Sequence, residues 1–323
     1  MSLIIQITKQ VTLDYLREIK DLSEIDLYKF TTELQGRIIV NIAVGPGQAS
    51  TTIPYENEDG SFTALTVPHC INRVTDSSVK RLMQPHVFLF RSFLTLNVTP
   101  LDRLVKRNAL RVRAALRKFM EDRRSGKNKS AEGDDLLSIL LTNDYYKNDD
   151  ELIIDEIFTL FLAGSKTVAT TTANLICYLD KSPNSKSKLL TEVDSSLSSI
   201  KDDFMGKFDL EKAEELDYLH MCFFEALRIE APVNAALDAV FTEEVVLGGI
   251  HFKTTDRICV AIDVIHHHPD HWQKPSQFLP ERFDPNSELY KRPDGGHRHP
   301  MAFTPFLGGQ RVCLGKTFAE KMV

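Results

Sequence analysis

The ten residues from Phe306 to Gly315, FLGGQRVCLG, place one cysteine among three glycines and one arginine. A thiolate binds soft metal ions, but a single thiolate without a nearby Cys or His cannot complete a zinc or iron–sulfur site. One protein thiolate is enough where a macrocycle supplies the other ligands, which indicates haem. The alternative interpretation is a buried free cysteine in a glycine-rich turn.

The residues around Cys313 each meet a requirement of a haem site. Gly309 and Gly315 remove side chains where a flat ring has to approach the backbone, and they leave backbone N–H groups to point at the sulfur. Arg311 carries a guanidinium group that could bind a propionate carboxylate. Phe306 would pack beside the sulfur and exclude water. Together these positions favour the haem interpretation over the bare turn.

The spacing of these residues resembles the haem-binding signature FxxGxRxCxG of the cytochrome P-450 family. The resemblance implies haem as the cofactor and Cys313 as the axial ligand of the haem iron. It implies haem-binding roles for Phe306, Gly309, Arg311 and Gly315. It also implies a small apolar substrate, O2 and an NADPH-dependent flavin reductase as partners.

Two further segments resemble the family in the expected order. FFEALR supplies Glu225 and Arg228 one helical turn apart, and FLPERF supplies Arg282. In the family these side chains form a buried network, where the loss of one member leaves an uncompensated charge. Taken alone, Glu225 and Arg228 are an ordinary exposed i,i+3 pair. With the other motifs present, the network is favoured.

The segment AGSKT, Ala163–Thr167, resembles the AGx(D/E)T box of the family's oxygen-activating helix. The resemblance implies that Ala163 and Gly164 open a groove over the iron and that Thr167 helps to deliver protons to dioxygen. A helical threonine can also bond its own backbone. Lys166 stands where the family usually has an acid, and a lysine does not relay protons as a carboxylate does. Proton delivery then uses water and Thr167, or the reaction is not the usual one.

A second departure concerns the haem propionates. The family usually places a basic residue on the strand after the Glu225–Arg228 helix, whereas this neighbourhood contains Asp238 and no base. An acid would repel a propionate, so either the alignment slips here or haem binding is weakened. The consecutive histidines His266–His268 are expected to be structural, because neighbours in a row point to opposite faces and chelate one ion poorly.

Periodicity predicts the elements that hold these motifs. The ranges Ser23–Gly45 and Pro100–Lys127 predict amphipathic helices, the first capped by Ser23. The range Asp150–Asp180 is apolar on nearly all sides, which predicts a central buried helix. Helices continue to about Ile229. An irregular break rich in Gly, Pro and Asn is expected at residues 45–60, and a surface loop is expected at residues 123–135. Short strand-like segments are expected at residues 243–252 and 257–265, with a tight Gly-Gly turn inside the first of the two.

The order of these elements predicts a mainly α fold with minor β structure. Residues 1–133 would form a helical part that precedes the central helix, and residues 134–323 would carry the central helix, the Glu225–Arg228 helix, a small β region and the cysteine loop. Relative to the family, this is a partial domain, incomplete at both ends. The apolar run in the N-terminal segment MSLIIQITKQ is too short for a membrane anchor or a signal peptide. A full-length form is expected on the endoplasmic reticulum membrane.

Composition narrows the class of protein. A chain of 323 residues with 42% hydrophobic content can bury a large core. The net charge of -6 gives no electrostatic argument for nucleic acid, so no such partner is expected. The five cysteines are scattered without a CxxC pair, which indicates a reducing compartment and argues against a zinc ribbon.

Three functions remain open at this point. The first is a haem-thiolate monooxygenase that inserts one oxygen atom from O2 into a small apolar organic substrate. The second, motivated by Lys166, is a haem-thiolate peroxygenase or isomerase-type enzyme. The third is a truncated, haem-poor chain without activity. A local basic excess could serve reductase docking or be a solvated surface; it comprises Lys274, Lys291, Arg292, Arg298, Lys316 and Lys321.

Overall fold

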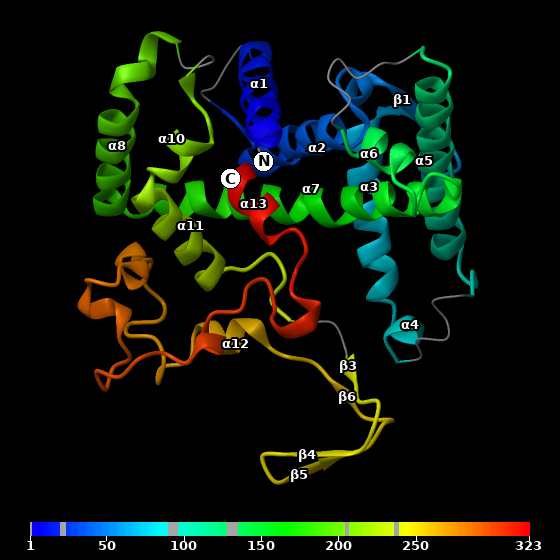
Figure 1. Cartoon of the computed structure of the whole chain (residues 1–323). Coiled ribbons are helices and arrows are strands. Elements are labelled where there is room, and N and C mark those ends of the chain that lie inside the picture. Colours follow the sequence, from blue (N-terminus) through cyan, green and yellow to red (C-terminus); the bar gives the residue numbers. More distant parts are fainter. Residues whose placement is uncertain (1, 20–23, 90–95, 128–134, 204–206, 236–238) are drawn as a thin grey trace. The chain divides into compact units, whose positions relative to one another are not determined.

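The computed structural model describes the chain except residues 1, 20–23, 90–95, 128–134, 204–206 and 236–238 (Figure 1). Apart from its last two residues, the chain divides into two compact units, Met1–Ala169 and Thr170–Lys321. Helix α7, Asp150–Asp180, runs from the first unit into the second and has the bounds expected for the central helix. The division therefore falls inside α7, whereas the sequence-based organisation divides the chain at residues 133 and 134.

The first unit is mainly helical. Its helices before α7 are α1 Ser2–Glu18, α2 Leu27–Val44, α3 Val67–Leu82, α4 Pro85–Leu89, α5 Pro100–Arg124 and α6 Leu136–Thr142. Asp26 caps α2 by accepting the Lys29 N–H at 3.0 Å. Ser23, the residue expected to cap this helix, lies outside the described residues. Thr99 and Asp102 form a reciprocal capping box at the start of α5.

The core of the first unit lies where α3 packs against both α2 and α5, with α7 contributing a further face. Each of these helices supplies apolar side chains that are almost fully buried: Ile38, Ile39, Ile71, Leu116, Met120 and Ile153. Burial of one such side chain stabilises the fold by about 1.5–3 kcal/mol. Within the described part of the chain, no helix is both long enough and apolar enough to cross a lipid bilayer.

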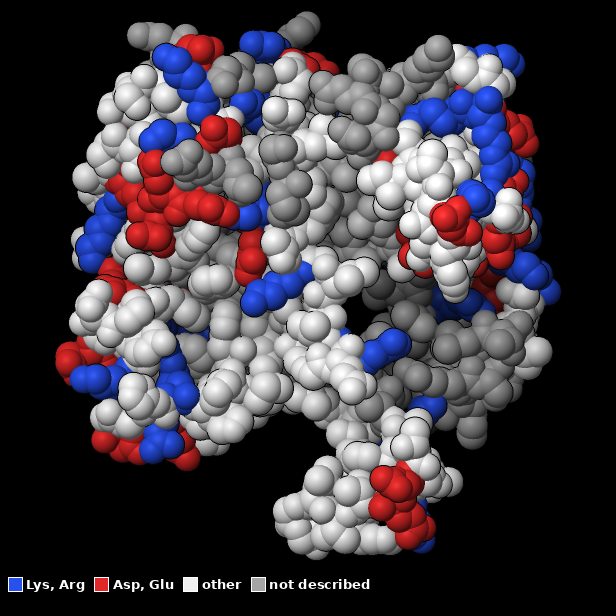
Figure 2. All heavy atoms as spheres, viewed as in Figure 1, with Lys and Arg blue, Asp and Glu red and all other residues white. Residues whose placement is uncertain are grey.

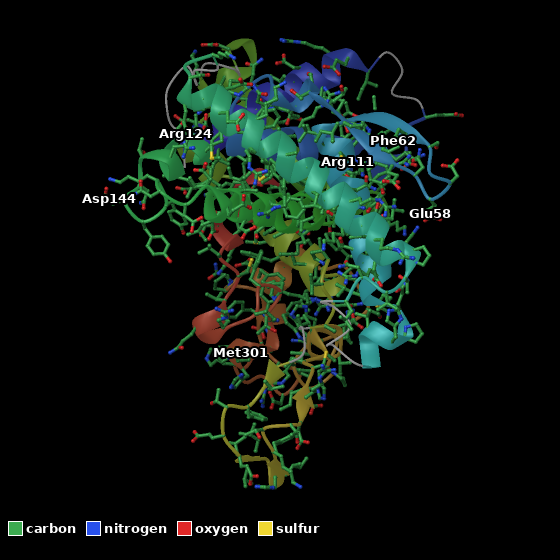
Figure 3. All side chains as sticks on the ribbon, turned by 90° about the vertical axis from the view of Figure 1, so that its right-hand side faces the viewer. Glu58, Phe62, Arg111, Arg124, Asp144 and Met301 are labelled. Carbon is green, nitrogen blue, oxygen red and sulfur yellow. The ribbon has the colours of Figure 1, made fainter. Side chains whose placement is uncertain are left out.

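A β-hairpin occupies part of the segment that was expected to be an irregular break. Strands β1, Thr52–Glu56, and β2, Phe62–Thr66, pair antiparallel along their whole length. The prediction of an irregular break over residues 45–60 is therefore wrong for β1. Ile53 and Tyr55 are buried and alternate with outward-facing residues, a period of two that is typical of a half-buried strand. In Figure 3, Phe62 of β2 lies beside Arg111 of α5, whose guanidinium carbon is 5.0 Å from the ring centroid.

The second unit combines short helices with small sheets. Its α-helices after α7 are α8 Pro183–Leu197, α10 Leu210–Glu214, α11 Asp217–Ile229, α12 Ile262–His266 and α13 Lys316–Met322. Its strands are β3 Ala239–Val240, which pairs with β6 Arg257–Ile258, and β4 Val245–Leu247, which pairs with β5 Ile250–Phe252. The mainly helical fold with small sheets confirms the predicted fold class.

The two predicted β segments of this unit have different outcomes. β4 and β5 meet at Gly248 and Gly249, which have φ angles of 56° and 79°, so the predicted Gly-Gly hairpin is confirmed. The prediction of a strand over residues 257–265 is wrong beyond Ile258, because α12 follows. Ile262 and His266 are both buried at i,i+4 spacing, which places them on one helical face.

The β4–β5 hairpin carries exposed apolar side chains. Val246 and Ile250 are each 61% exposed, and the hairpin surface at the lower end of Figure 2 is largely uncharged. A two-stranded hairpin of three residues a strand has little stability of its own, so its conformation depends on the turn and on the residues that flank it.

Candidate functional site

The Phe306–Gly315 loop is closed at its base by a backbone hydrogen bond, in which the Cys313 N–H donates to the Phe306 carbonyl at 2.8 Å. Between these residues the chain passes through a short 3-10 segment, Gly309–Arg311. Leu307 and Gly309 have φ angles of 62° and 67°. At Leu307 this conformation is strained, because its Cβ crowds the following carbonyl. The cysteine thus follows a tight loop that leads directly into α13.

The side chains of this loop present an exposed thiol beside apolar groups. Cys313 is exposed, and so are its neighbours Val312 and Leu314. Arg311 is exposed and Phe306 is half-buried. A thiol flanked by exposed apolar side chains and a guanidinium group suits a flat, largely apolar ring with a metal at its centre and carboxylates at its edge. The donor set is therefore compatible with haem.

The glycines of the loop have different structural roles. A Cβ on Gly308 would lie 2.9 Å from Cε of Met301, the side chain labelled in Figure 3, so a larger residue would displace that methionine. Around Gly309 no described atom lies within 4 Å of such a Cβ, and its positive φ is what favours glycine. A Cβ on Gly315 would lie 3.8 Å from the Cys313 sulfur, which is an ordinary contact distance.

None of the five cysteines is in a disulfide, and two of them, Cys70 and Cys222, are buried, whereas Cys313 is exposed. Burial raises the pKa of Cys70 to about 11 and the pKa of Cys222 to about 12, so both remain protonated thiols at neutral pH. Cys177 is exposed on helix α7, away from any glycine-rich loop in the sequence. Cys177 is therefore a suitable control for experiments on Cys313.

Glu225 lies at the centre of a fully buried charge cluster in the second unit. The Nε and Nη2 groups of Arg228 donate to the two carboxylate oxygens of Glu225 at 2.8 and 2.9 Å. Nε of Arg282 donates to Oε1 of the same carboxylate at 3.0 Å. All three side chains are 0% exposed, so Glu225 and Arg228 are not a surface pair. Burial lowers the pKa of Arg282, against the opposing effect of Glu225.

A third guanidinium group, that of Arg298, lies next to this cluster and packs on the ring of Trp272. The sequence analysis did not connect Arg298 or Trp272 with the cluster. The guanidinium carbon of Arg298 is 4.2 Å from the ring centroid of Trp272, and that of Arg228 is 5.2 Å from it. Arg298 also donates to the backbone carbonyls of Arg282 and Leu289. Burial, followed by the charge of Arg282, lowers the pKa of Arg298 to about 10. Trp272 is the single tryptophan of the chain, and this is the feature of the sequence that could have indicated a packing site here.

Lys166 is held by residues of two other helices in the first unit. Its Nζ forms an ion pair with Asp76 of α3 and lies 3.5 Å from the hydroxyl of Tyr28 in α2. The Lys166 side chain is 16% exposed and Asp76 is 56% exposed. The lysine that replaces the usual acid therefore contacts a carboxylate supplied by α3.

The remaining residues of the AGSKT segment also have contacts within the first unit. The Thr167 hydroxyl donates to the Ala163 carbonyl at 2.7 Å, the backbone bond considered as the alternative to a proton-delivery role. A Cβ on Gly164 would lie 3.0 Å from Cδ1 of Ile39, so the small residue permits close packing of α7 on α2. Ala163 is exposed on α7.

The predicted site residues fall into both units. Cys313 and its loop belong to Thr170–Lys321, whereas Ala163–Thr167 belongs to Met1–Ala169. Asp238, the acid expected to disturb a propionate, lies outside the described residues. In the described part of the chain, no group of three or more His, Cys, Asp or Glu side chains is arranged to hold a metal ion.

Several of the basic residues considered for reductase docking have acidic partners. Lys291 pairs with Glu288 at 3.2 Å, and Lys321 pairs with Glu214 at 3.0 Å. Arg292 pairs with Asp294, and Arg298 lies on Trp272. The positive charge of this group is therefore partly compensated within the chain.

Comparisons with known proteins agree on one family. The family model for cytochrome P450 matches residues 2–323. A segment of 173 residues is 34% identical to cytochrome P450 6B6 of Helicoverpa armigera, covering 53% of this chain and 32% of that protein. A longer alignment of 255 residues is 29% identical to cyclooctat-9-en-7-ol 5-monooxygenase of Streptomyces melanosporofaciens, covering 78% of this chain and 51% of that protein. These alignments span about a third to a half of the relatives' own lengths.

Solved structures show the same fold. The retinoic acid-bound cyanobacterial CYP120A1 superposes with a TM-score of 0.75 at 20% identity, covering 100% of this chain and 66% of that one. The haem domain of cytochrome P450DA gives a TM-score of 0.75 at 18% identity, covering 99% of this chain and 63% of that one. With a family model that matches almost every residue and a fold shared with these structures, the chain belongs to the cytochrome P450 family of oxidoreductases.

Proposed function

We propose that this chain carries the haem-binding part of a haem-thiolate monooxygenase that oxidises a small apolar organic substrate, with Cys313 as the ligand of the haem iron. The observation that carries the proposal is the exposed Cys313 thiol in a loop closed at its base by the Cys313–Phe306 hydrogen bond. Membership of the cytochrome P450 family supports it. A relative that is a 5-monooxygenase of cyclooctat-9-en-7-ol supports an apolar substrate.

The loop residues would divide the work of holding the cofactor. Cys313 would bind the iron as a thiolate, and the exposed Arg311 would donate hydrogen bonds to a propionate. Phe306 would cover the sulfur, while Gly309 and Gly315 would keep side chains away from the ring. Bound haem supplies the redox chemistry by which oxygen from O2 is activated.

On α7, Thr167 is the residue proposed to handle protons, and Lys166 the residue proposed to modify that step. The Thr167 hydroxyl donates to the Ala163 carbonyl, so it has to turn away from that carbonyl to donate a proton elsewhere. The Lys166 ammonium group is paired with Asp76, which directs it toward α3. Of the two small residues, the exposed Ala163 would leave space beside Thr167, whereas Gly164 is packed against Ile39 of α2.

The partners of the whole protein belong to the same proposal. O2 and electrons from NADPH, delivered by a flavin reductase, are what a monooxygenase of this family requires. The endoplasmic reticulum membrane is proposed as the location of a full-length form.

The test is the absorption spectrum of the haem-loaded chain after reduction and exposure to carbon monoxide. A strongly red-shifted Soret band is expected for the unmodified chain and for Cys177→Ser, and its loss is expected for Cys313→Ser. Haem uptake that is indifferent to Cys313 would contradict thiolate ligation. No haem uptake at all would support the third interpretation, a haem-poor chain without activity.

A second candidate is a haem-thiolate peroxygenase or isomerase-type enzyme, which the Lys166–Asp76 pair favours. Because position 166 holds no carboxylate and its cation is paired with Asp76, α7 lacks the usual acid of the family at this position. A peroxide already carries the protons and electrons that O2 lacks, so a peroxide-dependent reaction has less need of an acid at this position and of a reductase. Turnover of a peroxide without a reductase would support this candidate, and strictly reductase-dependent turnover with O2 would exclude it.

A further inference from the structure

His266 is fully buried and contacts two parts of the second unit. Its backbone carbonyl accepts a hydrogen bond from Nη1 of Arg228 at 2.9 Å. Its ring Nε2 accepts the backbone N–H of Thr304 at 2.9 Å. The ring also packs against Phe303, with centroids 5.3 Å apart. One residue therefore joins the Glu225 cluster to the segment that enters the cysteine loop.

Thr304 transmits this contact to the base of the loop. Its carbonyl accepts the Leu307 N–H at 3.0 Å, and two residues after it the Phe306 carbonyl accepts the Cys313 N–H at 2.8 Å. Residues 309–314 are exposed, so few packing contacts hold them. The position of the sulfur consequently depends on how the base of the loop is anchored.

The ring of His266 is suited to a permanent acceptor role. Because Nε2 accepts a hydrogen bond, the proton of the neutral ring is on Nδ1. Burial, followed by the charge of Arg228, lowers the pKa of His266 to about 4, so the ring stays neutral near pH 7. Its neighbours bond locally instead: Nδ1 of His267 lies 2.9 Å from the Asp263 carbonyl, and Nδ1 of His268 accepts the Asp270 N–H at 3.3 Å.

We propose that His266 is a positioning residue for the cysteine loop, which fixes Phe306 and Cys313 relative to the Glu225–Arg228 pair by accepting the Thr304 N–H. The consequence for haem rests on the proposed function, in which Cys313 binds the iron. The effect on the loop itself does not depend on haem and can be measured without it.

Two substitutions separate the acceptor from the ring. His266→Phe keeps an aromatic ring against Phe303 but leaves the buried Thr304 N–H without an acceptor. His266→Gln can place its Oε1 near the position of Nε2 and keep the acceptor. His267→Gln is the matched control, because it changes a neighbouring, partly exposed histidine outside this contact.

The first measurement is amide hydrogen exchange of the chain without haem. In His266→Phe, exchange of the 302–313 segment is expected to be about tenfold faster, while α5 keeps its protection. In His266→Gln and His267→Gln the 302–313 segment should exchange at the unmodified rate. After haem loading, only His266→Phe should show a smaller fraction of the red-shifted, thiolate-type band in the reduced carbon monoxide spectrum.

Faster exchange throughout the chain in His266→Phe would mean that His266 only stabilises the fold, and the proposal would be wrong. Equal acceleration of the 302–313 segment in His266→Gln and His266→Phe would also overturn it, since the acceptor would then not matter. If the unmodified chain shows no Cys313-dependent haem band, the proposed function fails. The exchange rates still decide whether His266 fixes the loop.

Discussion

Arg282 donates to the Glu225 carboxylate at 3.0 Å, although the two residues are 57 positions apart in the chain. Arg228 binds both oxygens of the same carboxylate, and Arg298 lies nearby on the ring of Trp272. One buried carboxylate thus faces two guanidinium groups, with a third close to them. We therefore expect the stability of the cluster to depend more on the carboxylate of Glu225 than on the guanidinium group of Arg298.

Substitution of Glu225 by Gln is expected to lower the free energy of unfolding by about 3–5 kcal/mol, because two buried guanidinium groups lose their counter-charge. Arg298→Met should cost less, about 1–2 kcal/mol, since it removes a cation–π contact and two hydrogen bonds to backbone carbonyls but also relieves repulsion by Arg282. Urea unfolding followed by circular dichroism measures both values.

Equal losses in these two variants would contradict the central role of the carboxylate. If Glu225→Gln does not fold, Glu225→Asp keeps the charge on a shorter side chain and should fall between Glu225→Gln and the unmodified chain in yield and stability. A yield of Glu225→Asp no better than that of Glu225→Gln would show that geometry, and not charge, dominates.

The Lys166–Asp76 ion pair can be tested by reversing its charges. Lys166→Glu replaces attraction to Asp76 by repulsion and should lower the free energy of unfolding by about 1 kcal/mol, a small value because Asp76 is mostly exposed. Lys166→Glu combined with Asp76→Lys should recover most of this loss. Chemical denaturation of the two single variants and the double variant gives the coupling free energy. Additive losses would show that the pair does not form in solution.

The elements of the fold that could be predicted from the sequence are those whose sequence pattern lies within the element itself. The bounds of α7 follow from one long apolar run, and the turn at Gly248 and Gly249 follows from two adjacent glycines. The β1 strand was missed because Pro54 and nearby Asn and Gly residues obscured the alternation of Ile53 and Tyr55. In each case a pattern within one continuous segment of the chain determined the outcome.

The contacts of the candidate site depend on packing between distant segments. Nothing in the sequence around Lys166 indicates that α3 would bring Asp76 to it. The contact of Arg298 with Trp272 joins two loop segments, and that of His266 with Thr304 joins the end of the short helix α12 to a loop, so no periodic pattern predicts either pairing. The motifs indicated which residues matter, whereas the pairing of their side chains required the tertiary structure.

The two glycines that flank Cys313 should respond differently to substitution by alanine. Gly309→Ala is expected to lower the free energy of unfolding by about 1 kcal/mol, because an L-residue is strained at a φ of 67°. Gly315→Ala should change stability by less than about 0.5 kcal/mol, since its Cβ meets the sulfur at an ordinary distance and φ is -83°. If a haem ring covers this position, Gly315→Ala should weaken haem binding all the same. Unfolding curves measure the stability of both variants, and haem titrations measure their haem binding. An equal loss of stability in Gly315→Ala and Gly309→Ala would contradict the expected difference.

The buried neutral ring of His266 should make stability depend on pH. The pKa of His266 is lowered from 6.5 to about 4 in the folded chain. Between these values the unfolded chain binds a proton that the folded chain does not, so the free energy of unfolding falls as the pH falls through this window. From pH 7 to pH 5 this contribution is about 2 kcal/mol, whereas well above pH 6.5 the ring is neutral in both states and contributes nothing.

His266→Gln removes the titrating ring but keeps an acceptor for Thr304, so its stability should fall less between pH 7 and pH 5 than that of the unmodified chain. His267→Gln is the control, because it changes a neighbouring histidine and leaves the buried His266 ring in place. Urea unfolding at several pH values measures the three slopes. Acidic groups with lowered pKa, such as Glu281, act mainly at lower pH and are common to all three chains, so they cancel in the comparison. If the free energy of unfolding has the same pH slope in His266→Gln and in the unmodified chain, the folded chain takes up a proton on His266 between pH 7 and pH 5. A ring protonated on both nitrogens could not accept the Thr304 N–H through Nε2.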